Sequence, residues 1–373
     1  MPTLSSPLNI GTMTLAHRIV MAPMTRLRSD SYHVPHSMVV DYYSQRASSG
    51  GLLITEATFI SHSSCGRDAN APGIYTKAQI EAWRRVTNAV HAKGGYITMQ
   101  LWHVGRAARP AALAAEGLEM VSSSAVPIPP RNGEKYATPR PMTEDEIWQS
   151  VAEFAQAARN AVVEAGFDAV EIHAANGYLI DQFLQDTCNQ RTDQWGGSVE
   201  NRSRFCVEVT KAVCNAIGPE RTGVRLCPYG QFQGMGMNDP IPQFTDLISR
   251  LRPLRLGYLH LIEPRVSGNI DRDVKEQENL DFAFKAWNHA GPVLLAGGYT
   301  PKTAKKVVEE NHREDDVAIA FGRHFVSNPD LPFRVLNCIP LTHYDRETFY
   351  KTESPDGYID YAFSKEWCAS QMR

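Results

Sequence analysis

The chain has 373 residues, 43% of them hydrophobic and 21% charged, and its 38 basic and 41 acidic residues give a net charge of −3. This composition is typical of a globular protein with a large core, and its near-balance of charge provides no field that would attract nucleic acid or an anionic membrane. No apolar run approaches the roughly 20 residues that are needed to span a bilayer.

The cysteines and the first residues bear on the compartment. Seven scattered cysteines without a CxxC pair argue against a disulfide framework or a zinc site, and they favour a reducing compartment. The chain does not begin with a basic segment followed by a long apolar stretch, so we expect no secretory signal and a cytoplasmic location. His33 and His36 suggest a metal pair, but Pro35 between them prevents a helical i,i+3 face, and we predict no metal site.

Apolar runs alternate with helical patterns along the chain. Residues 7–15 resemble a small β-hairpin, which we expect to plug the bottom of a barrel. The runs expected to be strands are Ile19–Ala22, Leu52–Thr55, Tyr96–Leu101, Ala169–Ile172, Thr222–Leu226, Tyr258–Ile262, Val293–Ala296 and Val317–Phe321. The helices expected between them include Gln79–Lys93, Glu144–Ala165, Val199–Ile217 and Pro301–Glu310.

These runs are continuously apolar, as parallel strands covered on both faces are. Eight βα units in one chain predict an α/β fold of the (β/α)8 TIM-barrel type. An open doubly wound sheet is the alternative, but no GxGxxG follows the first run.

We expect a single barrel domain over residues 1–373, with one long insertion at about 104–142 after the third strand. This insertion is too long for a plain connection and is rich in proline. We expect it to form a lid or cap over the active face, with a disordered surface loop as the alternative.

Barrel active sites lie at the C-terminal ends of the strands, and the fourth run is followed by His173, Asn176 and Tyr178. His and Asn can each donate a hydrogen bond, and Tyr carries a proton at neutral pH. Two donors that converge on one oxygen, with an acid nearby, suit a reaction in which a carbonyl gains negative charge. Taken singly, the three residues also fit a core histidine, an Asn-Gly turn and the start of a helix.

The last two strands suggest a phosphate site. Gly297 and Gly298 follow the seventh run, and Gly322 and Arg323 follow the eighth. In many barrels these two loops bind a phosphate. Glycine lets the backbone approach an anion closely, and Arg323 can pair with it. Glycines that simply end strands are the alternative.

Two long motifs carry a resemblance to a known family. They are HxxNGYLIDQFL, beginning at His173, and NxRTDxWGGSxENRxRF, ending at Phe205. Both are similar to segments of the old yellow enzyme family of flavin-dependent ene-reductases. Shorter motifs at five strand ends, namely PxT, QLW, RLxP, AGG and FGR, resemble the same family, so the resemblance runs over almost the whole chain.

The resemblance implies FMN as the cofactor and NADPH or NADH as the reductant. The residues that it assigns to FMN are Pro23, Met24, Thr25, Ala57, Gln100, His173, Arg225, Gly297, Gly298, Gly322 and Arg323. In this assignment Arg225 stabilises the reduced, anionic ring, Thr25 bonds the carbonyl edge of the ring, and Gln100 bonds the pyrimidine edge. A structural ion pair in the barrel mouth is the alternative for Arg225.

The chain departs from common members of that family at three positions. Ala57 stands where many have glycine, Gly298 where many have asparagine, and Cys227 where serine is usual. The first two changes are small and should tune flavin binding without abolishing it. For Cys227 we expect an inert buried thiol.

The resemblance also implies the reaction. His173 and Asn176 would hold the oxygen of an α,β-unsaturated carbonyl compound, FMN would deliver hydride to the β-carbon, and Tyr178 would protonate the α-carbon. The residues expected to shape the substrate cavity are Trp102, Phe232, Tyr299 and Tyr350. The expected partner is a small molecule, with no nucleic acid or membrane, and the chain is expected to be a monomer or a homodimer.

Segments 122–127 and 229–236 resemble fungal members of the family, some of which act on chanoclavine aldehyde in secondary metabolism. In that branch a tyrosine at the position of Tyr178 goes with reduction and a phenylalanine with isomerisation, so Tyr178 favours reduction.

Two other functions remain as alternatives. A flavin-free barrel aldolase or isomerase would need a lysine or paired carboxylates at strand ends, where Glu56 and Glu263 are the obvious carboxylates. A non-catalytic flavin-binding or ligand-carrier protein would not need His173, Asn176 and Tyr178 together.

Overall fold

A closed barrel of parallel strands forms the centre of the computed structural model, which describes residues 1–130, 136–268, 270–275 and 277–372. Within those residues eight strands form the ring: β3 (Ile19–Met21), β4 (Leu52–Ile54), β6 (Tyr96–Trp102), β9 (Ala169–Ala174), β10 (Thr222–Leu226), β11 (Tyr258–Ile262), β14 (Val293–Ala296) and β15 (Val317–Phe321). They pair in chain order, β15 pairs with β3, and β4 pairs with β6, so the ring closes. The predicted (β/α)8 fold is confirmed, and the open sheet is excluded.

The strands are apolar throughout because both of their faces are covered. Along β3, Ile19 and Met21 belong to the large core between the barrel and the helices, whereas Val20 belongs to a separate cluster inside the barrel. Leu53 and Ile54 of β4 divide between these two cores in the same way. This alternation follows from the two-residue repeat of a strand, and it gives the molecule one core inside the barrel and one around it.

The N-terminal hairpin closes the bottom of the barrel, as expected. Its strands are β1 (Leu8–Ile10) and β2 (Met13–Leu15), which pair antiparallel. Leu8, Ile10, Met13 and Leu15 are buried in the same cluster as the inward-facing barrel residues. Gly11, at the tip of the turn, has φ +54° and lies so close to the carbonyl of Glu220 that a Cβ there would be 1.8 Å from that oxygen. The hairpin therefore packs against the end of the barrel at which β10 begins.

Helices surround the ring, and several begin at side-chain caps. The described helices are α1 (Met38–Arg46), α2 (Lys77–His91), α4 (Glu144–Arg159), α5 (Leu179–Leu184), α6 (Val199–Ile217), α7 (Ile241–Leu251), α8 (Asp281–Trp287), α9 (Pro301–Lys306), α10 (Arg323–Ser327), α11 (Leu331–Leu336) and α12 (Lys365–Ser370), with α3 (Pro110–Glu116) in the insertion. The side chain of Thr143 caps α4 by accepting a hydrogen bond from the backbone N–H of Glu146. In return, the carboxylate of Glu146 accepts from the backbone N–H of Thr143. Ser198 caps α6 through one such bond, in which its side chain accepts from the backbone N–H of Asn201.

Two of the predicted helices change their geometry before they end. After α4 the chain makes a π-helical turn at Asn160–Glu164, and after α9 it makes another at Val307–Asn311. The helical segments thus end at Glu164 and Asn311, within one residue of the expected ends at Ala165 and Glu310, but their last turns are wider than an α-helix.

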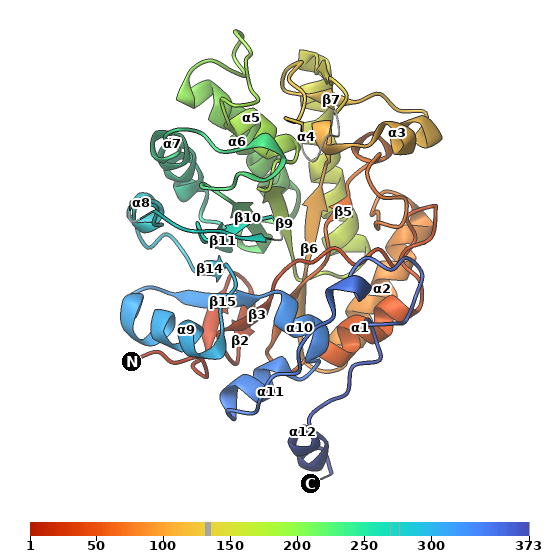
Figure 1. Cartoon of the computed structure of the whole chain (residues 1–373), viewed down its shortest axis with the longest axis vertical. Helices are drawn as coiled ribbons and strands as arrows, with labels where there is room; N and C mark the ends of the chain where they lie inside the picture. The colour runs from red at the N-terminus through yellow and green to blue at the C-terminus, as the bar shows by residue number, and fades with distance from the viewer. Residues whose placement is uncertain (131–135, 269, 276, 373) are drawn as a thin grey trace.

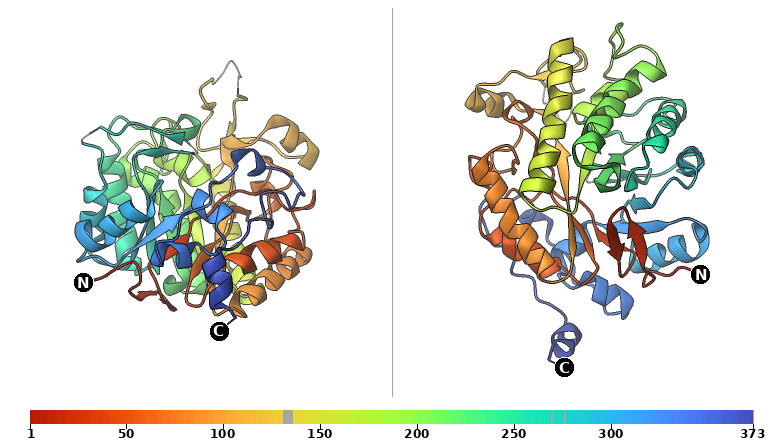
Figure 2. Two further views of the ribbon diagram at one scale, coloured as in Figure 1. Left: turned by 60° about the horizontal axis from the view of Figure 1, so that its bottom comes forward. Right: turned by 180° about the vertical axis from the view of Figure 1, so that it is seen from behind.

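The remaining elements lie outside the ring of eight strands. Strand β5 (Thr58–Phe59) extends the ring beside β6, and the insertion contributes α3 and the paired strands β7 (Val121–Ser122) and β8 (Arg140–Pro141). Strands β12 (Val266–Ser267) and β13 (Ile270–Asp271) form a small pair after β11. The C-terminal helix α12 extends away from the barrel (Figure 2). None of the described helices is long and apolar enough to span a membrane.

Candidate active site

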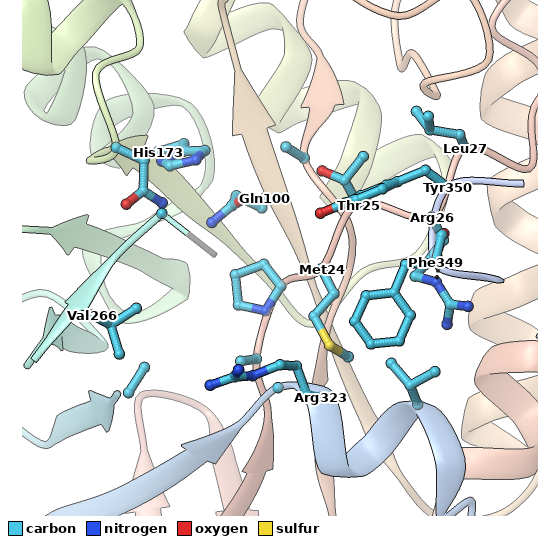
Figure 3. Close-up of a pocket in the computed structure, with 18 of the residues that line it drawn as sticks. Met24, Thr25, Arg26, Leu27, Gln100, His173, Val266, Arg323, Phe349 and Tyr350 are labelled. Carbon is cyan, nitrogen blue, oxygen red and sulfur yellow. Dashed lines mark hydrogen bonds between the residues drawn. The ribbon is translucent and has the colours of Figure 1, made fainter. Parts of the chain in front are cut away.

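One cavity of about 1290 Å³ opens at the C-terminal ends of the barrel strands. It brings together every residue proposed from the sequence for catalysis, cofactor or substrate: Pro23, Met24, Thr25, Ala57, Gln100, Trp102, His173, Asn176, Tyr178, Arg225, Phe232, Gly297, Gly298, Tyr299, Gly322, Arg323 and Tyr350. In Figure 3 His173 and Gln100 lie toward one end of the cavity and Arg323 toward the other, with Met24 and Phe349 between them. The roles of these residues stay predictions, but their convergence is a property of the fold.

The turn after β9 positions the candidate catalytic residues Asn176 and Tyr178. Asn176 has φ +60° and Gly177 has φ +74°, so the chain turns sharply as it leaves the strand. A Cβ at Gly177 would lie 2.8 Å from Cβ of Gln233, so glycine is required there. The side-chain amide of Gln233 donates to the carbonyl of Asn176 (2.7 Å), which ties the turn to the loop that carries Phe232.

His173 is held neutral by its surroundings. Burial, together with the nearby positive charge of Arg225, lowers the pKa of His173 to about 3. Its Nδ1 is buried and has no hydrogen-bond partner among the described residues. A neutral imidazole has one N–H donor and one acceptor nitrogen, so His173 can offer a hydrogen bond to a ligand without carrying a charge.

Tyr178 lies against two rings and a cation. The edges of Trp102 and His173 meet its ring at centroid distances of 5.0 Å each. The guanidinium carbon of Arg67 lies 5.7 Å from the centre of the ring. Burial raises the pKa of Tyr178, while Arg67 opposes that rise and Asp68 adds to it. The phenol therefore keeps its proton at neutral pH and is available as an acid.

The floor of the cavity rests on a buried carboxylate that the sequence analysis assigned no role. Glu171 of β9 is completely buried, and its oxygens accept hydrogen bonds from Nε2 of Gln100 (2.7 Å), Nδ1 of His260 (2.7 Å) and the hydroxyl of Tyr258 (3.1 Å). Because a carboxylate can only accept, the amide nitrogen of Gln100 must point at Glu171. The amide oxygen of Gln100 is thereby left as an acceptor for a ligand in the cavity.

Glycines form the end of the cavity near Arg323. At Gly297 a Cβ would lie 2.4 Å from Cβ of Glu263, and at Gly298, where φ is +65°, it would lie 3.1 Å from Nη2 of Arg265. At Gly322 the nearest atom to a Cβ would be Sδ of Met24, at 3.6 Å, which is ordinary van der Waals contact. The backbone of these glycines and the guanidinium of Arg323 therefore lie at this end of the cavity.

Charged residues at the cavity wall were missed by the sequence analysis. Arg67 donates to the carbonyl of Ala107 (2.8 Å) and to the side chain of Gln233 (3.3 Å). Asp68 forms ion pairs with Arg67 (3.5 Å) and Arg109 (3.0 Å). No local pattern marks these residues, because their loop follows β5 and is held at the cavity by contacts with distant segments, including the insertion and the loop after β10.

A second missed group fastens the C-terminal segment to the cavity. Arg28 is fully buried and donates to the backbone carbonyls of Phe349 (2.9 Å), Ser354 (2.9 Å) and Asp356 (3.0 Å). Arg26 donates to the carbonyl of Gly357 at 2.6 Å. The segment that carries Phe349 and Tyr350 into the cavity is thus held by arginines that follow the first strand.

The insertion lies beside the cavity. Of its described residues, Arg109 lines the cavity. Arg106 is buried and donates to the carbonyls of Val126 (3.0 Å) and Gln233 (3.0 Å), which joins the insertion to the loop after β10. The expected lid remains a prediction for this segment, part of which (residues 131–135) falls outside the described residues.

Of the three departures noted in the sequence, two border the cavity and one is buried beside it. Ala57 is buried and Gly298 gives room to Arg265. Cys227 packs with Ala175 and Ile262, and burial raises the pKa of its thiol to about 12. A protonated, buried thiol fits the expected inert role.

Comparisons with known proteins all match this chain to reductases and other oxidoreductases. The model of the NADH:flavin oxidoreductase / NADH oxidase family matches residues 3–342. Chanoclavine-I aldehyde reductase fgaOx3 of Penicillium roqueforti (strain FM164) is 54% identical over 98% of both chains. The probable inactive reductase easA of Epichloe festucae var. lolii is 50% identical over 99% of this chain and 97% of its own.

Solved structures agree with these sequence matches. The old yellow enzyme homologue of Zymomonas mobilis has a TM-score of 0.89 and 41% identity, and the match covers 97% of this chain and 99% of that one. Morphinone reductase in complex with tetrahydroNAD has a TM-score of 0.87 and 38% identity, with 98% and 99% covered.

Proposed function

Because the chain belongs to the NADH:flavin oxidoreductase / NADH oxidase family, we propose that it is an NAD(P)H-dependent, FMN-containing ene-reductase that acts on α,β-unsaturated carbonyl compounds. The observation that carries this proposal is the grouping of a neutral His173, Asn176 and a protonated Tyr178 on one wall of the cavity. Hydrogen-bond donors beside an acid suit a carbonyl that gains negative charge as the reaction proceeds.

The residues present fit FMN. Nε of Arg225 is buried without a hydrogen-bond partner among the described residues, which a ligand with negative charge would satisfy. Gln100 offers an acceptor for a ring N–H, and the glycine backbone with Arg323 offers a place for a phosphate. Thr25 and Met24 line the space between these ends. We therefore assign Gln100, Arg225 and Arg323 to holding the cofactor.

The reaction follows from these assignments. FMN supplies the transfer of hydride from reduced nicotinamide to the β-carbon of the substrate. His173 and Asn176 donate hydrogen bonds to the carbonyl oxygen of the substrate, which stabilises the charge that develops there. Tyr178 gives its phenolic proton to the α-carbon. The rings of Trp102 and Phe232 confine the substrate and exclude water.

The natural substrate is proposed to be an aldehyde of the chanoclavine type. The support is the 54% identity with a chanoclavine-I aldehyde reductase along almost the full length of both chains, together with the tyrosine at position 178. A 50% identical relative is described as a probable inactive reductase, so the assay on this chain has to measure reduction directly.

The test begins with the cofactor. The purified protein should be yellow, and heat should release FMN that chromatography separates from FAD. Cyclohexenone should then reoxidise the reduced protein, with NADPH and NADH compared as reductants. Release of FAD or of no flavin would contradict the cofactor assignment, and a flavin-loaded protein that reduces no enone would contradict the ene-reductase proposal.

A further inference from the structure

A negative charge lies deep inside the barrel, beneath the cavity. Glu171 has no exposed surface. The neighbouring strand β6 places Gln100 level with it, and β11, on the far side of β10, places His260 within hydrogen-bonding distance. A charge this far from water is costly unless donors surround it. Three donors do so, which shows that the network is built around a carboxylate rather than a carboxylic acid.

The charges of this network can be assigned group by group. Burial alone would raise the pKa of Glu171, but His260, Arg225 and Gln100 together hold it below its usual range, so Glu171 is ionised. Burial lowers the pKa of His260, whose Nε2 is buried without a partner among the described residues. Nδ1 of His260 donates its N–H to Glu171. The carboxylate of Glu171 therefore brings one negative charge to the network.

The charge that faces it is the guanidinium of Arg225. Arg225 is on β10, next to β9, where it pairs in register with His173, and its side chain lines the cavity. Glu171 acts on Arg225 through space, since the described structure has no hydrogen bond between them. Arg225 stays protonated at neutral pH, so the cavity floor combines a cation at the surface with an anion beneath it.

We propose that Glu171 is a positioning residue that partly offsets the charge of Arg225 and so lowers the reduction potential of the FMN bound above it. The inference rests on the proposed place of FMN beside Arg225. A guanidinium alone would stabilise the reduced, anionic ring and make it a poor donor of hydride to an enone. The buried carboxylate moderates that effect, so that reduced FMN forms and still gives up its electrons.

The variant Glu171→Gln removes the negative charge of this side chain and keeps its shape. The new amide oxygen can accept from Gln100, and its nitrogen can donate to the hydroxyl of Tyr258. Because Nε2 of His260 has no partner, that ring can move its proton from Nδ1 to Nε2 and accept from the new amide. Shape and hydrogen bonds are therefore conserved while one negative charge disappears, and we expect the variant to fold and to bind FMN.

The expected result is a higher midpoint potential of bound FMN, measured by equilibrium titration with a reference dye. Loss of one buried charge near the cofactor should shift the reduced-to-oxidised ratio by roughly tenfold, which is about 30 mV for a two-electron couple. In stopped flow, reduction by NAD(P)H should accelerate and reoxidation by cyclohexenone should slow. The matched control is Tyr258→Phe, which removes a neutral donor from the same carboxylate and should leave the potential close to that of the wild type.

Several outcomes would overturn the proposal. They are an unchanged or lower potential in Glu171→Gln, an equal rise in Tyr258→Phe, or a Gln variant that does not fold or does not take up FMN. The proposed function is judged separately, by flavin content and enone reduction in the wild-type protein. A wild type that binds FMN and reduces enones, with an unshifted variant, would reject only the role of Glu171.

Discussion

Tyr178 lies between a cation and two aromatic edges, and at the scale of single residues these neighbours determine what its phenol can do. Burial raises its pKa and Arg67, 5.7 Å from the ring centre, limits the rise. The proton is thus retained at neutral pH but is held beside a positive charge that would stabilise the phenolate left after transfer.

Replacing Tyr178 with Phe separates the two halves of the reaction. The ring and its contacts with Trp102 and His173 remain, and only the proton is lost. Reduction of FMN by nicotinamide should stay close to the wild-type rate, because it needs no proton from this group. Reoxidation by cyclohexenone should slow by at least about tenfold, since general acids contribute roughly 10²–10⁴-fold. Stopped-flow absorbance measures both steps, and an unchanged enone rate would assign the proton to solvent.

The donors His173 and Asn176 should matter for binding as well as for rate. His173→Ala or Asn176→Ala should slow enone reduction by about a hundredfold or more, because one donor to a developing oxyanion is worth roughly 3 kcal/mol. Both variants should also bind phenols more weakly, which absorbance titration of the bound flavin reports. The exposed His289 offers a control for the substitution, since His289→Ala lies on the outer surface. Full phenol affinity in both active-site variants would remove these donors from the mechanism.

Residues at or just beyond the C-terminal ends of strands could be predicted from the sequence, whereas residues deeper inside strands could not. Arg225 and Arg323 were found because barrel sites occur at strand ends. Glu171 and His260 stand within apolar runs that were read only as buried strands. A charged residue in such a run is itself a signal, since burial requires partners, but its partners come from other strands and become visible only when the ring closes.

At the scale of elements, the loop after β3 is joined to the C-terminal segment by buried arginines. Arg26 and Arg28 donate to carbonyls of residues 348–357 and not to carboxylates. Tyr42 and Tyr358 stack at 4.1 Å beside them. These contacts connect positions more than 300 residues apart, which local sequence patterns cannot predict. The strands, the hairpin and the capped helices could be predicted because their signals are local.

The variant Arg28→Lys tests this connection. Lysine keeps the charge but cannot reproduce the planar fork that reaches several carbonyls at once. Amides of residues 348–357 should exchange hydrogen faster, and FMN should dissociate more readily because Phe349 lines the cavity. Hydrogen-exchange mass spectrometry measures the first effect and flavin fluorescence the second. Arg84→Lys, on an exposed helix surface, should change neither. Unaltered exchange in Arg28→Lys would show that the segment is held by other contacts.

At the scale of the whole molecule, buried neutral histidines make stability depend on pH. Burial lowers the pKa of His17 to about 4 and the pKa values of His103 and His173 to about 3. In the unfolded chain these groups take up protons near pH 6.5. Between about pH 6.5 and 4 the unfolded state therefore binds more protons than the folded state, so the free energy of unfolding should fall as the pH is lowered through this window.

Urea unfolding at a series of pH values measures this slope, and His103→Gln supplies the comparison. Nδ1 of His103 accepts from the backbone N–H of Gly105 (3.2 Å), which the side-chain oxygen of glutamine can also do. The variant should take up about one proton fewer on unfolding in this window, so its slope should be shallower by one proton. An identical slope would mean that His103 is already protonated in the folded protein.

The hairpin at the bottom of the barrel also has a kinetic consequence. Because β1 and β2 fill the end of the barrel opposite the cavity, the nicotinamide and the enone of the proposed reaction would both enter through the cavity and bind in it. The two reactants therefore take turns, and the oxidised coenzyme must depart before the enone is admitted. Steady-state turnover should give parallel double-reciprocal plots, with each reactant inhibiting at high concentration by occupying the form of the protein that awaits the other.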